Sequence, residues 1–186
     1  MADILFDSIP SLDLADFTKG DEKKRKKFVE DLGEAYQNIG FVAIKNHGLS
    51  DELQEKLYAA VKKFFALPDE VKKKYEIEGL AGQRGYTGKG KEHAKGRNTG
   101  DLKEFYHVGQ EVDKNDPVLS QYPANVFPEE VPEFKTYTLA AFRVLEEAGL
   151  QILRAIALYL GLAEHYFDAK AKKGNSILRP IHYYPI

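Results

Sequence analysis

The chain contains no cysteine among its 186 residues. This absence excludes disulfides, thiolate zinc sites, iron–sulfur clusters and cysteine nucleophiles, and it agrees with a reducing compartment. A charge excess of either sign is also missing, because 27 basic and 29 acidic side chains leave a formal charge of -2. A net charge this small predicts no general attraction to nucleic acid or to an anionic membrane.

Signals for export and for membrane insertion are missing as well. The opening residues, MADILFDSIPSLDL, carry acids and lack a basic stretch followed by an apolar one, so they do not resemble a secretory signal. No apolar run approaches the roughly 20 residues needed to span a bilayer. With 43% hydrophobic residues the chain can still bury a core. We therefore expect a folded, soluble and cytoplasmic protein.

A complete iron site built from two histidines and one carboxylate is not visible in the sequence. Such a site needs a His-x-Asp or His-x-Glu pair and a distant second histidine. None of the five histidines starts such a pair; they are His47, His93, His107, His165 and His182. The HExxH and GxSxG motifs are absent too, which argues against a zinc protease and a serine hydrolase. The histidines are interpreted as structural.

A glycine- and lysine-rich segment is the nearest approach to a nucleotide site. Residues 85–91 match the first seven positions of GxxxxGK[ST], but Glu92 replaces the hydroxyl residue that would hold magnesium. Around Glu92 lie five basic residues, which give a local excess of +4; they are Arg84, Lys89, Lys91, Lys95 and Arg97. This excess could attract an anionic substrate or serve solubility alone, and the second interpretation is preferred.

Hydrophobic periodicity predicts alternating helices and short strands. Helices are expected over 21–38, from the N-cap Ser50 to Pro68, over 69–75 and over 133–160, and strands over 9–14, 41–44, 104–108 and 176–184. The segments 78–103 and 111–132 are expected to be irregular. A strand close to the end of the chain, with nothing after it to pair with, favours a chain that is part of something longer.

Several short motifs together resemble one known family. They are Ile9-Pro10, Gly40-Phe41, Asn46-His47-Gly48-Leu49, Phe64-Phe65-Ala66-Leu67-Pro68, Arg84-Gly85-Tyr86, Asp101 to Tyr106, and Leu160-Gly161-Leu162. In this order and spacing they resemble the N-terminal region of the isopenicillin N synthase-like Fe(II), 2-oxoglutarate-dependent dioxygenases, with 88–109 most similar to bacterial members.

The resemblance implies an α+β fold, the helix-rich N-terminal portion of a double-stranded β-helix (jelly-roll) oxygenase. Residues 1–110 would form the N-terminal oxygenase region, 111–132 a linker, and 133–186 a long buttressing helix and the first strand of a barrel that is largely missing. The family's HxD, second histidine and Arg-x-Ser would all come later. We therefore expect an intact protein that uses Fe(II) and 2-oxoglutarate, while this chain alone binds neither and is inactive.

The closing strand carries the expected cosubstrate contact. In the family a tyrosine of this strand hydrogen-bonds 2-oxoglutarate. Counting from Arg179 matches it to Tyr183, and counting back from Pro185 matches it to Tyr184. Alternation places the two tyrosines on opposite faces, so only one points inward, and Tyr183 is preferred.

The resemblance also predicts how partners are bound. The loop 81–103 would lie on the side of a small-molecule substrate, with Arg84, Tyr86 and Lys103 as candidate contacts. An alternative is a non-catalytic binding or oligomerisation module that kept the N-terminal fold, with self-association through the unpaired C-terminal strand.

Overall fold

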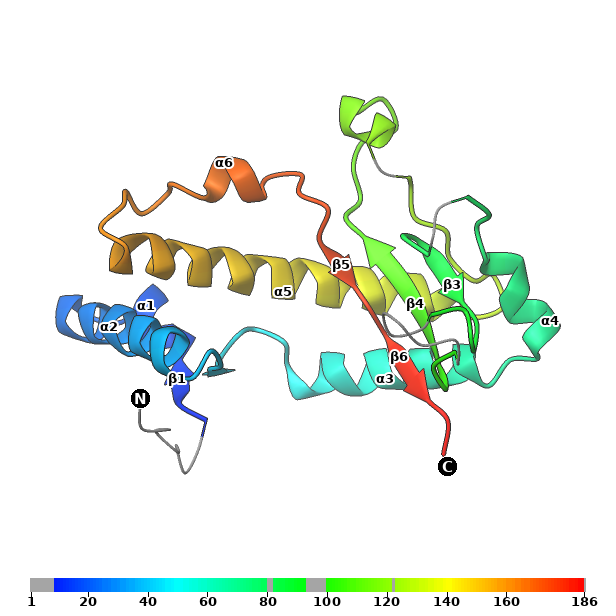
Figure 1. The fold of residues 1–186 in the computed structure, drawn as a ribbon, viewed down its shortest axis with the longest axis horizontal. Helices are drawn as coiled ribbons and strands as arrows, with labels where there is room; N and C mark the ends of the chain where they lie inside the picture. The colour runs from blue at the N-terminus through cyan, green and yellow to red at the C-terminus, as the bar shows by residue number, and fades with distance from the viewer. Residues whose placement is uncertain (1–8, 80–81, 93–99, 122, 186) are drawn as a thin grey trace. The chain divides into compact units, whose positions relative to one another are not determined.

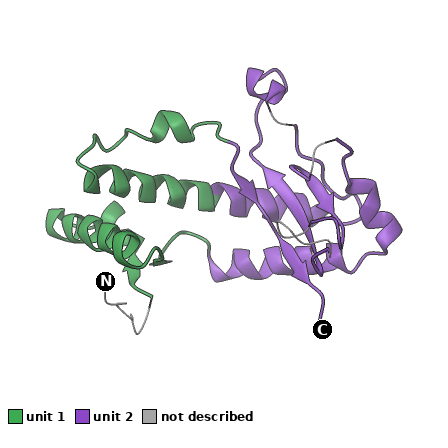
Figure 2. Cartoon of the chain, in the orientation of Figure 1, with its two compact units in different colours: residues 1–49, 144–174 green, residues 50–143, 175–186 purple. Residues whose placement is uncertain are grey.

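The computed structural model describes residues 9–79, 82–92, 100–121 and 123–185, and the chain divides into two compact units. Unit 1 comprises residues 1–49 and 144–174, and unit 2 comprises residues 50–143 and 175–186 (Figure 2). The longest helix, α5 (Pro132–Tyr159), contributes to both units because the division falls within it. Each unit is therefore described by itself.

Unit 1 is a small helical unit with one pair of strands. Its further elements are β1 (Ser11–Asp13), α1 (Leu14–Thr18), α2 (Glu22–Asn38), β2 (Ala43–Lys45) and α6 (Asp168–Ala171). The two strands are parallel. Asp13 and Asp21 begin the two N-terminal helices, since their carboxylates accept the N–H groups of Ala15 and Lys24. The buried side chains are mainly Leu14, Phe17, Phe28, Leu32, Ala148 and Ala155.

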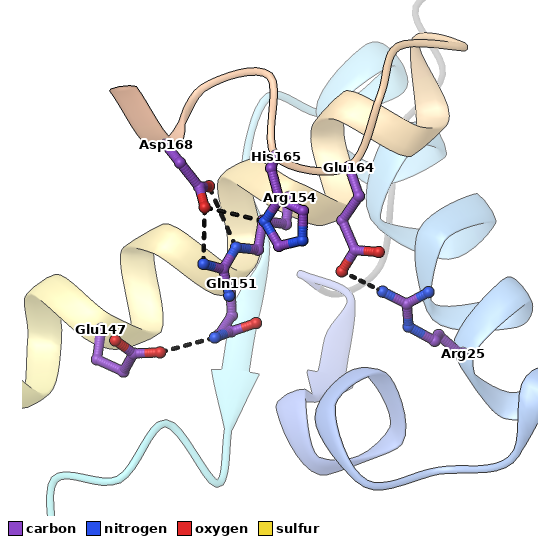
Figure 3. Close-up of polar contacts among 7 residues, drawn as sticks. All are labelled: Arg25, Glu147, Gln151, Arg154, Glu164, His165 and Asp168. Carbon is purple, nitrogen blue, oxygen red and sulfur yellow. Dashed lines mark hydrogen bonds and ion pairs between the residues drawn. The ribbon is translucent and has the colours of Figure 1, made fainter. Parts of the chain in front are cut away.

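A polar cluster fixes the segment that follows α5 in unit 1 (Figure 3). The Asp168 carboxylate accepts hydrogen bonds from Nε and Nη2 of Arg154 at 3.2 and 2.8 Å. His165 Nδ1 lies 2.9 Å from the same carboxylate. Arg25 on α2 pairs with Glu164 at 2.5 Å. Because these charges pair with one another, we interpret the cluster as structural.

Unit 2 is built around a small antiparallel sheet (Figure 1). Its elements besides α5 are α3 (Asp51–Phe65), α4 (Asp69–Lys72), the 3-10 turns η1 (Lys73–Tyr75) and η2 (Pro117–Ser120), β3 (Gly85–Thr87), β4 (Lys103–Gly109), β5 (Ile177–Leu178) and β6 (Ile181–Tyr183). Strand β4 is central, with β3 on one side and both β5 and β6 on the other. The end of the chain is thereby joined to the middle of the sequence.

The core of unit 2 is aromatic. Phe64 on α3 is fully buried, and its ring centroid lies 5.0 Å from that of Tyr106 and 5.4 Å from that of Phe134. Edge-on and tilted contacts of this kind are favourable arrangements for aromatic rings. The other buried members are Phe65, Tyr75, Tyr86, Val108, Val131 and Leu139.

The helices expected over 21–38, from Ser50 and over 133–160 are confirmed, and the one expected over 69–75 is α4 followed by the 3-10 turn η1. The N-cap Ser50 is confirmed too, since its Oγ accepts the N–H of Leu53 at 3.2 Å. The strands are confirmed with changes. Strand β3 lies within the segment 78–103, which was expected to be irregular. The expected strand over 176–184 is divided before Ile181, where Pro180 has no N–H for the ladder. The described residues mix helix and sheet and contain no closed barrel.

Candidate functional site

The sheet of unit 2 has two chemically different faces. Side chains alternate along β4, and residues directly opposite on β6 share a face with their partners. His182 lies opposite Glu104, and Tyr183 lies opposite Lys103. We call these the Glu104 face and the Tyr183 face. The Glu104 face also carries Tyr106 and Val108, and the Tyr183 face also carries Phe105, His107 and Ile181.

On the Glu104 face, several donors converge on one buried carboxylate. Glu104 has no exposed surface. Its Oε2 accepts hydrogen bonds from Lys72 Nζ at 2.7 Å and from the Tyr86 hydroxyl at 2.5 Å. Its Oε1 lies 2.8 Å from His182 Nδ1, and the Tyr184 hydroxyl also bonds to the carboxylate. We call these five side chains the Glu104 cluster.

The Glu104 cluster keeps its charges in spite of burial. Burial alone would raise the pKa of Glu104, but hydrogen bonds from Lys72, Tyr86, His182 and Tyr184 outweigh it and hold the pKa below its usual value. Burial likewise acts to lower the pKa of Lys72, whereas its bonds to Glu104 and Asp69 raise it overall. The pair is therefore a carboxylate and an ammonium at neutral pH. This ion pair is suited to holding α4, which carries Lys72, against β4, which carries Glu104.

On the Tyr183 face, His107 is fixed between two partners. Its Nδ1 lies 2.5 Å from the carbonyl oxygen of Gly82, so this nitrogen carries the hydrogen and donates it. Nε2 is then free to accept a hydrogen bond from Nε of Arg179. The Arg179 guanidinium also lies over the Phe105 ring, 4.4 Å from its centroid. This face thus presents an oriented cation beside a neutral imidazole.

Stability is expected to depend on pH through His107. Burial, followed by the charge of Arg179, lowers its pKa from 6.5 to about 4. Above pH 6.5 neither the folded nor the unfolded chain is protonated at this site. As the pH falls from 6.5 towards 4, the unfolded chain binds a proton that the folded chain excludes, so the free energy of unfolding decreases by up to about 3 kcal/mol.

Urea unfolding from about pH 7 to about pH 5 measures this effect. The variant His107→Gln should lack this part of the pH dependence, because glutamine does not titrate. Equal pH slopes for the variant and the original chain would contradict the assignment.

The two tyrosines of the closing strand lie in different surroundings. Tyr183 is 66% exposed on the face that bears its name. Tyr184 is half-buried, and its hydroxyl bonds to Glu104 while Lys89 Nζ lies 5.0 Å from its ring centroid. The expectation that they point to opposite faces agrees with this placement. Which of them contacts 2-oxoglutarate stays a prediction.

Of the three candidate substrate contacts, Lys103 lies on the Tyr183 face, directly opposite Tyr183. Its Nζ pairs with Glu92 at 2.8 Å and with Asp101 at 3.0 Å. Tyr86 belongs to the Glu104 cluster and is buried.

Arg84 is buried as well, at 1% exposure, and its guanidinium donates to the carbonyl oxygen of Gln83 and to the side chain of Asn175. All three substrate roles stay predictions. The burial of Arg84 and Tyr86 favours Lys103 among the three. Lys95 and Arg97 of the basic segment lie outside the described residues.

The Glu104 cluster itself was not predicted from the sequence. A glutamate that alternates with Tyr106 and Val108 along one strand is the signal that could have indicated it, because an acid on a buried face needs buried partners. A metal site can be judged only for the part of the chain described. Within residues 9–79, 82–92, 100–121 and 123–185, no three His, Asp or Glu side chains are grouped so that they could hold a metal ion. No helix in these ranges is long and apolar enough to cross a membrane.

Comparison with known protein families gives one match that covers most of the chain. Residues 9–130 match the family described as non-haem dioxygenase in morphine synthesis N-terminal. A 2-oxoglutarate-dependent dioxygenase of Aspergillus flavus is 32% identical over 200 residues, which cover 94% of this chain and 55% of the fungal protein. Leucoanthocyanidin dioxygenase of Malus domestica is 31% identical over 95% of this chain and 48% of its own length.

Solved structures show the same relationship. A 2OG-Fe(II) oxygenase family protein from Caulobacter crescentus matches with a TM-score of 0.84 and 34% identity, over 96% of this chain and 57% of that protein. A Neurospora crassa protein solved with alpha-KG and thymine matches with a TM-score of 0.79 and 27% identity, over 94% of this chain and 55% of its own. The chain thus spans about half the length of the relatives it matches.

Proposed function

The chain belongs to the non-haem dioxygenase family, and we propose that it forms the N-terminal part of an enzyme that oxidises a small organic substrate with O2 and 2-oxoglutarate. The family match over residues 9–130 is the observation that carries this proposal. Relatives named as 2-oxoglutarate-dependent dioxygenases support the cosubstrate. In such an enzyme, Fe(II) and 2-oxoglutarate supply the oxidising chemistry, and the cosubstrate leaves as succinate and CO2.

The iron site of this enzyme is not assigned to the described residues. Among residues 9–79, 82–92, 100–121 and 123–185, no three His, Asp or Glu side chains are grouped so that they could hold a metal ion. We infer that the 186 residues alone are inactive. Their contribution would be the part of α5 in unit 2, where Phe134 packs against Tyr106 of the sheet, and the side chains of the Tyr183 face.

Tyr183 is the proposed contact to 2-oxoglutarate. Its side chain is 66% exposed, whereas the hydroxyl of Tyr184 is already bonded to Glu104. A carboxylate ligand needs donors that are not committed elsewhere. Lys103 lies directly opposite Tyr183 on the same face, where its ammonium pairs with Glu92 and Asp101.

Removal of the Tyr183 hydroxyl should weaken 2-oxoglutarate binding. A hydrogen bond to a charged group contributes about 1.5–3 kcal/mol, so Tyr183→Phe should raise KM for 2-oxoglutarate roughly 10- to 100-fold, with kcat changed less. Succinate formation is measured against 2-oxoglutarate concentration in the full-length enzyme. Tyr166→Phe, an exposed tyrosine of unit 1, is the control. An unchanged KM in Tyr183→Phe would exclude the contact.

The first test of the proposed function is to determine the complete coding sequence and to assay its product. The encoding gene is read past the codon for Ile186, and its complete product is purified and supplied with Fe(II), O2 and 2-oxoglutarate. We expect about 100 further residues with an HxD pair, a second histidine and Arg-x-Ser, in line with the three-ligand iron sites of such oxygenases, and slow succinate release that a substrate accelerates. A complete gene without these motifs, and a product that forms no succinate, would refute the proposal.

A second candidate function is a non-catalytic binding module. Exposed apolar side chains along β5 and β6 favour it, because Ile177 is 37% and Ile181 is 38% exposed. Such an edge can pair with a strand of another chain. A stop codon directly after Ile186, with a dimer of the product in analytical ultracentrifugation, would favour this candidate over the enzyme.

A further inference from the structure

The residues on either side of Tyr183 are bound to the same buried carboxylate. His182 Nδ1 lies 2.8 Å from Glu104 Oε1, and the Tyr184 hydroxyl also bonds to Glu104. The His182 ring further stacks on Phe65, with 5.5 Å between centroids and 29° between planes. His182 of β6 and Tyr184, directly after the strand, therefore point to the Glu104 face, and Tyr183 between them points to the other.

The backbone of β6 fixes this orientation only weakly. The strand has three residues, and Pro180 and Pro185 on either side of it have no N–H to donate. Slippage of a strand by one residue transfers every side chain to the opposite face. Because positions 183 and 184 are both tyrosine, a slip by one residue would place Tyr184 where Tyr183 was, and the Tyr183 face would still carry a tyrosine.

The carboxylate that binds β6 is itself held from two other elements. Lys72 on α4 and Tyr86 on β3 both donate to Glu104 Oε2, at 2.7 and 2.5 Å. They leave Oε1 for His182. Charge-assisted hydrogen bonds in a dry interior are directional and strong, so they can determine which of two similar registers is occupied.

We propose that Glu104 is a positioning residue, which binds His182 and Tyr184 and thereby keeps Tyr183 on the Tyr183 face of the sheet, where its side chain is exposed. The inference rests on the proposed function, because it assigns to Tyr183 the 2-oxoglutarate contact. Glu104 itself does not touch the cosubstrate; it acts through β6. Lys72 and Tyr86 hold the carboxylate, and His182 and Tyr184 transmit its position.

The first test measures KM for 2-oxoglutarate in the full-length enzyme. The double variant His182→Phe/Tyr184→Phe keeps both rings and leaves the Lys72–Glu104–Tyr86 bonds in place. Since misplacement of a binding group by about 1 Å is costly, KM should rise roughly tenfold with a smaller change in kcat. In a Tyr183→Phe background the same double substitution should have almost no further effect, because the group that it positions is already gone.

The second test measures strand register without activity. The chain has no cysteine, so any disulfide that forms after two cysteines are introduced must join those two residues. Tyr184 N donates to the carbonyl oxygen of Leu102 at 3.3 Å, which makes the neighbouring pair Lys103 and Tyr183 a non-hydrogen-bonded pair. Its Cα atoms should lie about 4.5 Å apart, within disulfide range. The pair Lys103→Cys/Tyr183→Cys should oxidise readily, and roughly tenfold more slowly after His182→Phe/Tyr184→Phe, as expected for a strand that leaves its register.

A cysteine pair between β4 and β3, on the other edge of β4, controls for a loss of order throughout the sheet. Thr87 lies opposite Phe105 on β3 and β4, and its cysteine pair should oxidise at the same rate with and without the β6 substitutions. Equal slowing of both pairs, an unchanged rate for the Lys103–Tyr183 pair, or additive effects on KM would each overturn the positioning role. Failure of the original enzyme to consume 2-oxoglutarate would instead refute the proposed function, while slower trapping of the β6 pair alone would still support Glu104 as the residue that sets the register.

Discussion

Glu104→Leu should lower the free energy of unfolding by roughly 3–5 kcal/mol, because it leaves the buried ammonium of Lys72 without its buried partner. Lys72 is 3% exposed, and its remaining carboxylate, Asp69, has an exposed side chain. The substitution also removes the acceptor for Tyr86 and His182. Urea unfolding of the chain, followed by circular dichroism, measures the loss.

Two further variants separate lost charge pairing from lost packing. Lys72→Met/Glu104→Leu removes both charges and should recover most of the stability, since an apolar pair of similar volume is a good substitute for a buried ion pair. Glu52→Gln removes a carboxylate from an exposed pair with Lys56 on α3 and should leave the urea midpoint unchanged. A loss in Glu104→Leu no larger than that in Glu52→Gln would show that the buried pair does not stabilise unit 2.

Phe64→Ala should destabilise unit 2 to a similar extent, by about 3–5 kcal/mol, because it leaves a cavity at the centre of the aromatic core. Phe64 has no exposed surface, and its ring centroid lies 5.0 Å from that of Tyr106 and 5.4 Å from that of Phe134. The same unfolding experiment measures the effect.

Phe64→Leu should lose less, since leucine fills most of the volume. Tyr58→Ala, on the same helix but 58% exposed, is the matched control and should change the midpoint only slightly. If Phe64→Ala unfolded at the same urea concentration as Tyr58→Ala, the aromatic cluster would not be the core of unit 2.

The sequence was sufficient for elements whose stability is local. Helix α3 was predicted with its beginning because Ser50 is an N-cap followed by acids, and the structure has that hydrogen bond. Helix α5 was predicted from its length and period. Its buried face was less visible, because Ala148 and Ala155 are small, while the larger Leu145 is 39% exposed.

Elements that depend on distant pairing were predicted less well. Strand β3 has three residues in a glycine-rich segment, and it exists because β4 provides the hydrogen-bonding partner. Local propensity carries no signal for such a strand, since its stability comes from pairing with distant residues such as His107, opposite Gly85, and Phe105, opposite Thr87. The same holds for β6, which pairs with β4 from the far end of the chain.

The sequence by itself determined the family and the main helices, because these depend on ordered motifs and on local pattern. It also limited the predicted cosubstrate contact to Tyr183 or Tyr184 on the closing strand, and this contact stays a prediction. It also determined that the two tyrosines face opposite ways, since alternation is a property of the strand backbone. Only the tertiary structure decided which of them is open and which is bonded to Glu104, because the partners Lys72, Tyr86 and Glu104 come from three separate elements that folding brings together.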